Sequence, residues 1–505
     1  MARNGPTSGQ RLVVLNDRGG PAAHRAIGSI ERQGAQVLHR YGDRVLICAA
    51  PPATARVLDQ LPSVRAVHAA PIDRAPTRAS ASEELGIAAW NMRRSRDYAD
   101  AKRERPRDGE RWDLTGGLPE APDGPGMVHV VEEQATEQRS FFQTDLSPYL
   151  LGSVAVGIVI VDGPTAELKF SDAERTKVVA EVQEGLGWLA VQEPRASVTF
   201  AYDIRSVAIT NPPDPAKSGY ELLEAHWRDP ALASLGFSAS VLGARQYAEK
   251  IRSDLGTRWA YVAFFTKYPV EHFAYALKPK IVMHYDNNGW GPDNIDRVFA
   301  HESGHIFGAP DEYASANCSC TAKFGWFREP NGNCLSCTTT PVECLMAANT
   351  WAMCRHTPVH LGWRDSNNDG ILDDTATGQL FDYRKLCSAV PLLCQLIGLS
   401  SEPPTAAAGQ AGGGTGSGIA GITGVAGRPG RDPYAWPGGG VPMLLLERTL
   451  GPDELARVTQ AAQAEEIEYL ETVERRLRAT LKQLRDYRES LEAGAGEDGR
   501  AGGRE

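Results

Sequence analysis

Short apolar runs separated by turn residues mark the first part of the chain. The segments RLVVLN, QVLHRY, RVLICAA and VRAVHAA are typical of strands, and two helix-like stretches lie among them, one ending near Gln33 and one reading PATARVLDQL. The resulting order β, α, β, β, α, β is that of a split βαβ sandwich. We therefore predict a small ferredoxin-like βαββαβ domain over residues 1–74.

The pattern changes between residues 75 and 148, which are rich in charge, Pro and Gly and include RRSRDYADAKRERPRDGER. No apolar period is sustained along this segment. A stretch of this composition does not bury enough apolar surface to order itself. We predict that residues 75–148 are mostly linker.

A second set of apolar patterns begins near Ser153. VAVGIVIVDG is typical of a buried strand, and ASVTFAYDI, WAYVAFFT and KIVMHY predict three more. Between the first two strands, Ser171 and Glu174 form a capping box. Apolar residues then recur at helical spacing, at Val178, Val179, Val182, Leu186 and Leu189. These patterns predict an α+β domain with a mixed sheet over residues 149–398.

A further helix, which Asp293 or Asn294 can cap, carries the sequence HESGH. His301 and His305 are four residues apart, so their imidazoles project from one helix face and can share a metal ion. Glu302 adjoins the first histidine and can take a proton from an attacking water as general base. This spacing predicts a zinc site that keeps one coordination position open.

The third ligand follows the end of this helix. Gly308 offers the left-handed residue that ends the helix and reverses the chain, so that Asp311 comes back towards the metal. The string HExGHxxGxPDEY, with the sheet and helix before it, resembles the metzincin-like peptidases. It is most similar to the immune inhibitor A type, which carries GLPDEY where this chain has GAPDEY. Metzincins proper carry His where this chain has Asp311, so the resemblance implies Asp311 as third ligand, with Glu312 as the alternative.

The same resemblance implies a zincin-like fold and a zinc-dependent metalloendopeptidase that acts on protein or peptide substrates. It also implies a methionine turn beneath the metal, for which CLMAANTWAMC supplies Met346 or Met353. We favour Met346. The residue that stabilises the oxyanion stays open among Tyr313, His356 and His360.

Two hypotheses about the function compete. A non-catalytic binding or scaffold protein that keeps zinc for structure is the alternative to a peptidase, but such a site closes its coordination sphere and has no use for Glu302 as a base. In front of this domain, Arg11 to Ala70 resembles the inhibitory propeptides of subtilisin-like proteases. That resemblance implies an inhibitor segment, whereas any small ferredoxin-like module would give the same pattern.

Six of the nine cysteines fall within residues 318–354, in an insertion of the predicted metal domain. In an oxidising compartment they would form three disulfides, and in a reducing one the CSC and CLSC spacing would suit a thiolate zinc site. We favour disulfides. Cys48 is predicted to be a buried thiol, and Cys387 and Cys394 are too far apart to pair within one continuous helix.

Residues 365–374 resemble the short DxNxDGxxD calcium repeats of dockerins and thrombospondins. Their oxygen side chains alternate before and after a Gly turn, at Asp365, Asn367, Asp369 and Asp373. The loop begins like an EF-hand, but Ala376 stands where the bidentate Glu belongs. We predict a structural calcium site, and the alternative is a polar turn.

The last part of the chain has a simpler pattern. Residues 399–450 are dominated by Gly, Ala and Pro and predict a flexible linker. Residues 451–494 predict a long helix in which Leu470, Leu477, Leu484 and Leu491 fall seven apart. A coiled coil and self-association through this helix are therefore expected, with a solvated charged helix as the alternative.

Charge and hydropathy limit the partners. A net charge of −10 over 505 residues gives no reason to expect nucleic-acid binding, and no apolar run is long enough to span a membrane. The start MARNGPTSGQRLVVL lacks the apolar core of a secretory signal. The cysteine cluster and the calcium loop nevertheless favour an extracellular location over a cytoplasmic one.

Overall fold

The computed structural model describes residues 9–16, 20–73, 75–76, 78–113, 146–368, 370 and 372–373. Those up to Leu372 belong to one compact unit. Among the described residues, no helix combines the length and the apolar content needed to cross a membrane. The predicted linker at 399–450, the predicted helix at 451–494, and Cys387 and Cys394 lie outside the described residues.

The N-terminal part has the predicted order of elements. It contains β1 (Gln10–Leu15), α1 (Gly20–Arg32), β2 (Gln36–Tyr41), β3 (Val45–Ala49), α2 (Pro52–Leu58) and β4 (Val64–His68). Its strands lie in the order β4-β1-β3-β2, and all neighbours are antiparallel. Cys48 on β3 is fully buried in the apolar core, as predicted.

The second part supplies the rest of the same sheet. Its elements are β5 (Ser153–Asp162), α6 (Asp172–Val191), β6 (Thr199–Ala208), α7 (Tyr220–Ser234), α8 (Val241–Leu255), β7 (Trp259–Thr266), β8 (Ala274–Leu277), β9 (Lys280–His284) and α9 (Ile295–Ile306). The four predicted strands are β5, β6, β7 and β9. The capping box and the apolar stripe predicted for α6 are both present.

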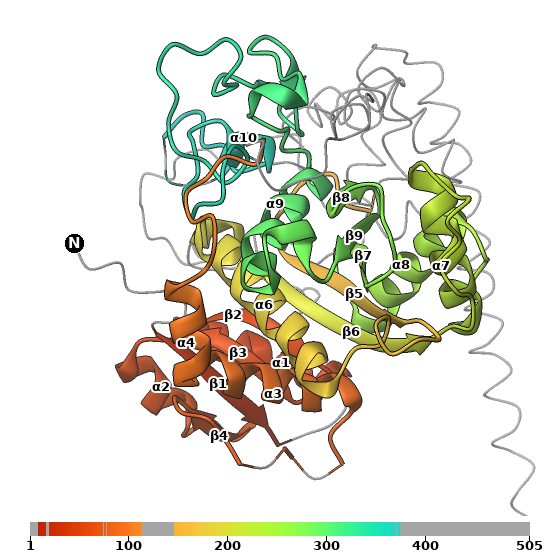
Figure 1. The fold of residues 1–505 in the computed structure, drawn as a ribbon. Helices are drawn as coiled ribbons and strands as arrows, with labels where there is room; N and C mark the ends of the chain where they lie inside the picture. Colours follow the sequence, from red (N-terminus) through yellow and green to blue (C-terminus); the bar gives the residue numbers. More distant parts are fainter. Residues whose placement is uncertain are drawn as a thin grey trace, which may run out of the picture. The chain divides into compact units, whose positions relative to one another are not determined.

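The two parts share one mixed sheet of nine strands, in the order β4-β1-β3-β2-β6-β5-β7-β9-β8. Strand β2 pairs in parallel with β6, so the N-terminal strands continue the sheet and do not form a separate one. The strands from β6 to β9 are parallel, and β8 closes the edge in the antiparallel direction. The fold is therefore α+β with a mixed sheet, and the predicted boundary at residue 74 does not separate two sheets (Figure 1).

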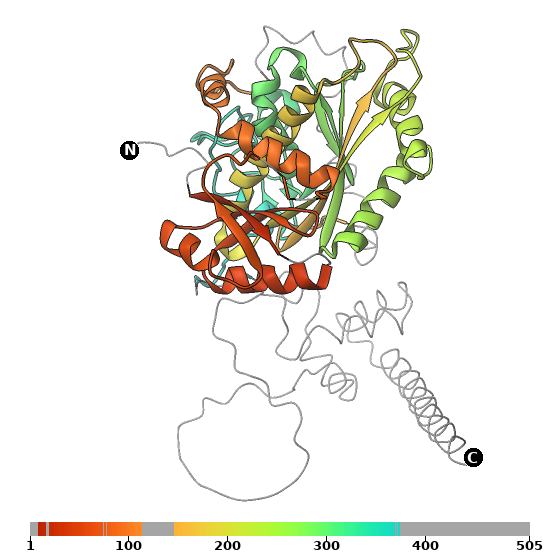
Figure 2. The ribbon, with the colours of Figure 1, turned by 90° about the horizontal axis from the view of Figure 1, so that it is seen from below.

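Helices cover both faces of the central strands (Figure 2). On one face, α7 and α8 bury Trp227, Tyr247 and Ile251 against β5 and β7. On the other face, α6 packs against α9, and Figure 1 shows the two helices side by side. Because α9 is the helix that carries HESGH, its buried position beside α6 and against β8 and β9 makes it a rigid support for the histidines.

The prediction that residues 75–148 are mostly linker is wrong for the described part of that segment. Helix α3 (Ala81–Arg93) begins with a capping box of Ser80 and Glu83, and α4 (Arg96–Arg103) follows it. Trp90 in α3 is fully buried, and α3 packs on α6. Three of its cations, Arg93, Lys102 and Arg105, pair with carboxylates elsewhere in the fold, so these charges do not keep the segment in solvent.

Candidate metal centre

Helix α9 and the turn after it position the predicted ligands. His301 and His305 lie one turn apart and both are buried. The helix ends where predicted, at Gly308, whose φ is +94°. The Gly308 N–H donates to the His305 carbonyl at 3.0 Å, and the Ala309 N–H donates to the Gly304 carbonyl at 2.9 Å. This pair of bonds is a Schellman motif. The chain turns back after Gly308 and brings Asp311 beneath the two histidines.

Three ligand atoms converge there. His301 Nε2 and His305 Nε2 lie 3.0 Å apart, and each is 3.2 Å from Asp311 Oδ1. Ligand atoms about 2.0–2.2 Å from a tetrahedral zinc ion lie roughly 3.3–3.5 Å apart. The three side chains thus form one group that could hold a metal ion.

The hydrogen bonds of the two rings determine which nitrogens face the group. His301 Nδ1 lies 3.1 Å from the carbonyl oxygen of Leu345, and His305 Nδ1 lies 2.8 Å from that of Ala309. A carbonyl only accepts, so each Nδ1 carries the proton and each Nε2 of a neutral ring presents a lone pair. Backbone carbonyls therefore orient both imidazoles so that their Nε2 atoms could bind a metal ion.

The carboxylates fit a cation at the same point. Among the described residues, no group donates a hydrogen bond to the buried atoms Asp311 Oδ1 and Glu302 Oε2. Lone pairs of Asp311 and two imidazoles this close repel one another unless positive charge lies between them. A proton supplies one such charge: burial lowers the pKa of His305, but the Asp311 carboxylate outweighs it and raises that pKa to about 9. A divalent ion would supply a larger charge, shared by all three side chains.

The pKa values of the two carboxyl groups at the centre, Asp311 and Glu302, are shifted in opposite directions. Burial would raise the pKa of Asp311, but His305 and His301 hold it well below its ordinary value, so this carboxyl is ionised. Burial raises the pKa of Glu302, and the two histidines offset that rise only in part. One carboxylate is thus suited to be a permanent ligand and the other to exchange a proton.

Met346 lies against the ligand helix. Its sulfur sits beside Gly304, where a Cβ would come within 3.0 Å of it, and Met346 is buried while Met353 is partly exposed. The Met346 carbonyl accepts a hydrogen bond of 2.9 Å from the Glu312 N–H. Met346 therefore contacts the ligand helix between the two histidines, and its role as a methionine turn stays a prediction.

Glu312, the alternative third ligand, points away from the metal centre. Its carboxyl group accepts hydrogen bonds from Asn333 at 2.6 Å and Thr357 at 3.2 Å, and one of its oxygens lies 3.0 Å from Cys354 Sγ. Burial raises the pKa of Glu312 to about 8. Of the two candidates for the third ligand, only Asp311 shares a ligand group with the histidines.

The three oxyanion candidates are in different places. Tyr313 is buried beside the centre, where burial and the carboxylates of Asp311 and Glu302 raise its pKa well above the ordinary value. His356 Nδ1 lies 2.7 Å from the Glu329 carboxylate, and His360 Nε2 lies 3.1 Å from the Glu329 carbonyl. Both histidines therefore face the insertion.

The segment before residue 114 reaches the metal centre, which the linker prediction did not anticipate. The Trp112 ring packs edge-on against His301, with 5.4 Å between ring centroids, and its Nε1 donates to the Leu345 carbonyl at 2.7 Å. Arg111 and Ala348 form an antiparallel bridge. Trp112 thus helps to fix the Leu345 carbonyl, which orients the His301 ring.

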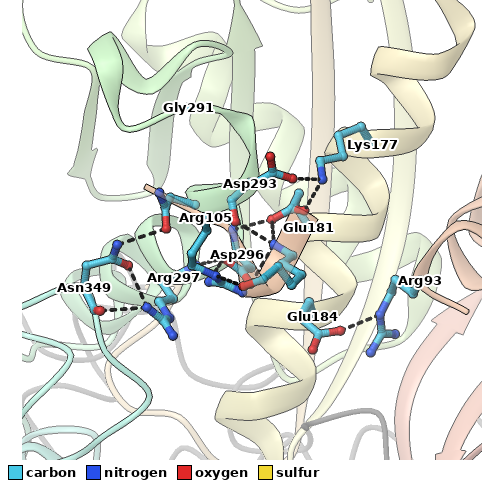
Figure 3. A network of polar contacts seen from close by, with 12 residues as sticks. Arg93, Arg105, Lys177, Glu181, Glu184, Gly291, Asp293, Asp296, Arg297 and Asn349 are labelled. Carbon is cyan, nitrogen blue, oxygen red and sulfur yellow. Dashed lines mark hydrogen bonds and ion pairs between the residues drawn. The ribbon is translucent and has the colours of Figure 1, made fainter. Parts of the chain in front are cut away.

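A buried charge network holds this segment on the start of α9 (Figure 3). Arg105 binds both oxygens of Asp296 at 3.1 and 3.2 Å, and Lys102 binds Asp296 at 2.9 Å and also pairs with Glu181 of α6. The side chains of Glu181 and Asp296 are fully buried. Because these pairs join residues 102–105 to both α6 and α9, they fix the helix that carries the ligands.

A second part of the network reaches the methionine turn. Arg297 donates to the Asn349 carbonyl at 2.7 Å, and Asn349 donates to the Asn294 side chain at 2.9 Å (Figure 3). Asn294 is the first flanking residue of α9, as predicted, but its side chain makes no capping bond. It is used instead to hold the turn after Met346 on the helix.

The insertion is cross-linked and contacts the ligand turn. Disulfides join Cys318 to Cys334 and Cys320 to Cys337. Two short strands, β10 (Lys323–Phe324) and β11 (Glu329–Pro330), pair within it, and a short helix, α10 (Thr357–His360), follows. Asn331 donates to the Asp311 carbonyl at 2.8 Å. Two of the three predicted disulfides are present, and the insertion braces the turn that carries Asp311.

The predicted calcium loop is described only in part. Asp369 lies outside the described residues. Asp365 accepts from Arg195 at 2.7 Å and from the Gly370 N–H at 3.1 Å. Asn367 follows Asp365 by two residues in the described part of this loop. Calcium binding stays a prediction.

The structure thus brings His301, Glu302, His305, Asp311 and Met346 together, as the sequence analysis expected of them. Trp112 is the functional neighbour that the sequence analysis missed, although the Ser80 capping box gave a signal that the segment before it is ordered. Comparison of the chain with protein-family models, curated proteins and solved structures finds no match. The chemistry of the centre is therefore inferred from its own residues.

Proposed function

We propose that the chain is a zinc-dependent metalloendopeptidase of the metzincin-like type, acting on protein or peptide substrates. The observation that carries this proposal is the convergence of His301 Nε2, His305 Nε2 and Asp311 Oδ1 within 3.2 Å of one another. Two imidazoles and a carboxylate are ligands that zinc accepts in catalytic sites. The resemblance of HESGHIFGAPDEY to metzincin-like motifs supports the assignment to peptide hydrolysis.

Glu302 is the general base of the reaction. It adjoins His301, only 1% of its surface is exposed, and Oε2 accepts no hydrogen bond from the described residues. Its raised pKa makes it a stronger base than an ordinary carboxylate. Glu302 takes a proton from the attacking water and returns it to the amine that leaves. A zinc ion at the three ligands supplies Lewis acidity and makes a water easier to deprotonate.

Tyr313 is the group that we retain as a donor to the oxyanion. Its side chain lies beside Asp311 and Glu302, whereas His356 and His360 are engaged with Glu329. A neutral hydroxyl can donate to the developing charge, and the raised pKa of Tyr313 keeps it protonated at neutral pH.

A structural zinc site in a binding or scaffold protein is the competing function. Such a site closes its coordination sphere with four protein ligands. Within the described residues, the ligand group at α9 contains three, His301, His305 and Asp311. An unpaired carboxylate at Glu302 also has no structural purpose there, since burying it is unfavourable. Both features favour the peptidase.

The test is cleavage of unfolded casein by the full chain, with bound zinc measured by elemental analysis. The Glu302→Gln variant keeps the shape of the side chain but cannot accept the proton, so we expect stoichiometric zinc and a loss of activity of about 10²–10⁴-fold. His305→Ala should lose both zinc and activity. Glu249→Gln, on the exposed side of α8, should keep both.

Full activity in Glu302→Gln would contradict the role of the base. If the chain held stoichiometric zinc but cleaved no substrate, the scaffold function would replace the peptidase. The two disulfides of the insertion are typical of oxidising compartments, and they support an extracellular location for this activity.

A further inference from the structure

A buried cluster of two thiols and a carboxyl lies next to the ligand turn. Cys344 and Cys354 are reduced, and only 0% and 3% of their surfaces are exposed. Their sulfurs and a carboxylate oxygen of Glu312 all lie within 4.8 Å of one another. The Thr357 hydroxyl contacts both sulfurs at 3.3 Å. Once the two disulfides of the insertion are formed, these two cysteines of the six-cysteine segment remain as neighbours.

The chain between the two cysteines is a closed loop. The Leu345 N–H, next to Cys344, donates to the carbonyl of Ala352, two residues before Cys354, at 2.8 Å, so the two ends of the loop are held together. A disulfide joins sulfurs of cysteines whose Cα atoms lie about 4.4–6.8 Å apart, and here the two sulfurs already lie within 4.8 Å of each other. A bond between Cys344 and Cys354 would need only a local movement of two side chains.

This loop holds the metal centre. The Leu345 carbonyl accepts from His301 Nδ1 at 3.1 Å, and the Met346 carbonyl accepts from the Glu312 N–H at 2.9 Å. Partners of this kind fix the orientation of a metal-ligating histidine. A covalent closure of the loop would therefore restrict the groups that orient His301 and the turn after Asp311.

The chemistry of the two thiols suits this bond. The N–H groups of His356 and Thr357 donate to the Cys354 sulfur at 3.3 and 3.4 Å. The Cys344 thiol, together with the Glu312 carboxyl and Thr357, outweighs burial and lowers the pKa of Cys354 to about 5, which favours the thiolate that starts disulfide exchange. The neighbouring disulfides indicate that thiols of this segment are oxidised where the protein works.

We propose that Cys344 and Cys354 form a third, redox-sensitive disulfide, which closes the loop carrying Met346 and stabilises His301 in its metal-binding orientation. Control of the metal centre by this bond rests on the proposed function, whereas the bond itself does not. Glutathione disulfide is the oxidant. The Cys354 thiolate attacks one of its sulfurs, a mixed disulfide forms and one glutathione leaves as a thiolate.

The Cys344 sulfur then attacks Cys354 Sγ, and the second glutathione leaves. The two protein thiols lose two electrons and two protons, the glutathione disulfide is reduced, and the protons end on the two released glutathione molecules. Both protein sulfurs are buried, so exchange needs local opening and should take hours in the folded protein.

The bond is tested by mass spectrometry of the full wild-type chain after long incubation with glutathione disulfide. The chain is denatured in N-ethylmaleimide without reductant, then cut with trypsin and a glutamyl endopeptidase, which release residues 344–355 by cleavage after Glu343 and Arg355. We expect this peptide to be two hydrogen atoms lighter than the dithiol and to carry no maleimide. A peptide that carries two maleimides would overturn the proposal.

A thiolate metal site is the competing use of the same cysteines. A second zinc ion per chain, with Cys344 and Cys354 protected from maleimide only until a chelator is added, would also overturn the disulfide. The measurement needs no variant to fold and no catalytic activity. Its outcome is therefore independent of whether Glu302→Gln abolishes cleavage.

Control of the metal centre is tested by the rate at which zinc passes to a chromogenic chelator. The Cys344→Ser/Cys354→Ser double variant cannot close the loop, and we expect it to release zinc about tenfold faster than the oxidised wild type, as for loss of a group that orients a ligand. Cys48→Ala, in β3, is the matched control and should not change the rate. Equal rates in all three proteins would overturn the control of zinc binding by this bond.

Discussion

Asp296 gives the sharpest test of how α9 is held. Its carboxylate is fully buried and contacts Lys102 at 2.9 Å and Arg105 at 3.1 and 3.2 Å. Asp296→Asn keeps the size of the side chain and removes its charge. Arg105 then keeps no carboxylate from α9 and Lys102 keeps only that of Glu181, while both cations remain largely buried.

Two routes give the size of the effect. Removing one partner of a buried ion pair costs about 3–5 kcal/mol, and the remaining contact of Lys102 with Glu181 places this case near the lower end. Lys102 and Arg105 outweigh the effect of burial and lower the pKa of Asp296 from 3.8 to about 2, which corresponds to roughly 2 kcal/mol. A loss of about 3 kcal/mol should lower the melting temperature of a unit of this size by roughly 4 °C.

The assay is thermal unfolding followed by tryptophan fluorescence, with Arg96→Ala as control. Arg96 pairs with Asp100 at the surface, where its side chain is 92% exposed, and it should have no measurable effect. In a Lys102→Met background, Asp296→Asn should cost less than it does alone, because the two residues share one contact. If Asp296→Asn lowers the melting temperature no more than Arg96→Ala does, the network does not stabilise α9.

Three further predictions follow from the same structure. A methyl group at Gly185 would overlap the Asp296 carbonyl where α6 meets α9, so Gly185→Ala should destabilise the protein by roughly 1–3 kcal/mol in urea unfolding. The control is Gly28→Ala in α1, where the added methyl group has space and the substitution should be neutral or stabilising. Destabilisation of equal size in both variants would contradict this packing. The pKa of Asp296 is lowered in the folded state, so its carboxylate contributes fully to the free energy of unfolding above about pH 4 and loses this contribution as the pH falls through about 2. The melting temperatures of wild type and Asp296→Asn should therefore converge between these pH values, and a constant difference would argue against the ion pairs. After limited proteolysis within residues 114–145, the two fragments should elute together in size-exclusion chromatography, because the pairing of β2 with β6 and the buried ion pairs do not depend on that segment. Separate elution of the fragments would show that these contacts are too weak to hold them together.

Short-range patterns were enough to predict most of the elements. The strands β5, β6, β7 and β9 and the capping box of α6 depend on residues within a few positions of one another, and so does the end of α9 at Gly308. Helices α7 and α8 and strand β8 are not among the predicted elements. The four-residue spacing of His301 and His305 is also local, because one helical turn alone places both rings on the same face.

The linker prediction failed for a long-range reason. Lys102 and Arg105 belong to a segment without apolar periodicity, and their partners Glu181 and Asp296 lie 79 and 191 positions further along the chain. Charge composition alone favours solvent exposure. Nothing local indicates that these charges meet buried carboxylates.

The sequence by itself therefore determined the helix with its two histidines, Glu302 beside them and the turn that reverses the chain. Only the tertiary structure decided that Asp311 and not Glu312 joins the histidines, that Met346 contacts their helix at Gly304, and which cysteines are neighbours. The physical reason is that one turn of helix fixes its side chains through local geometry. The other choices depend on where separate segments meet, which is settled by burial of apolar surface and pairing of charges across the whole fold.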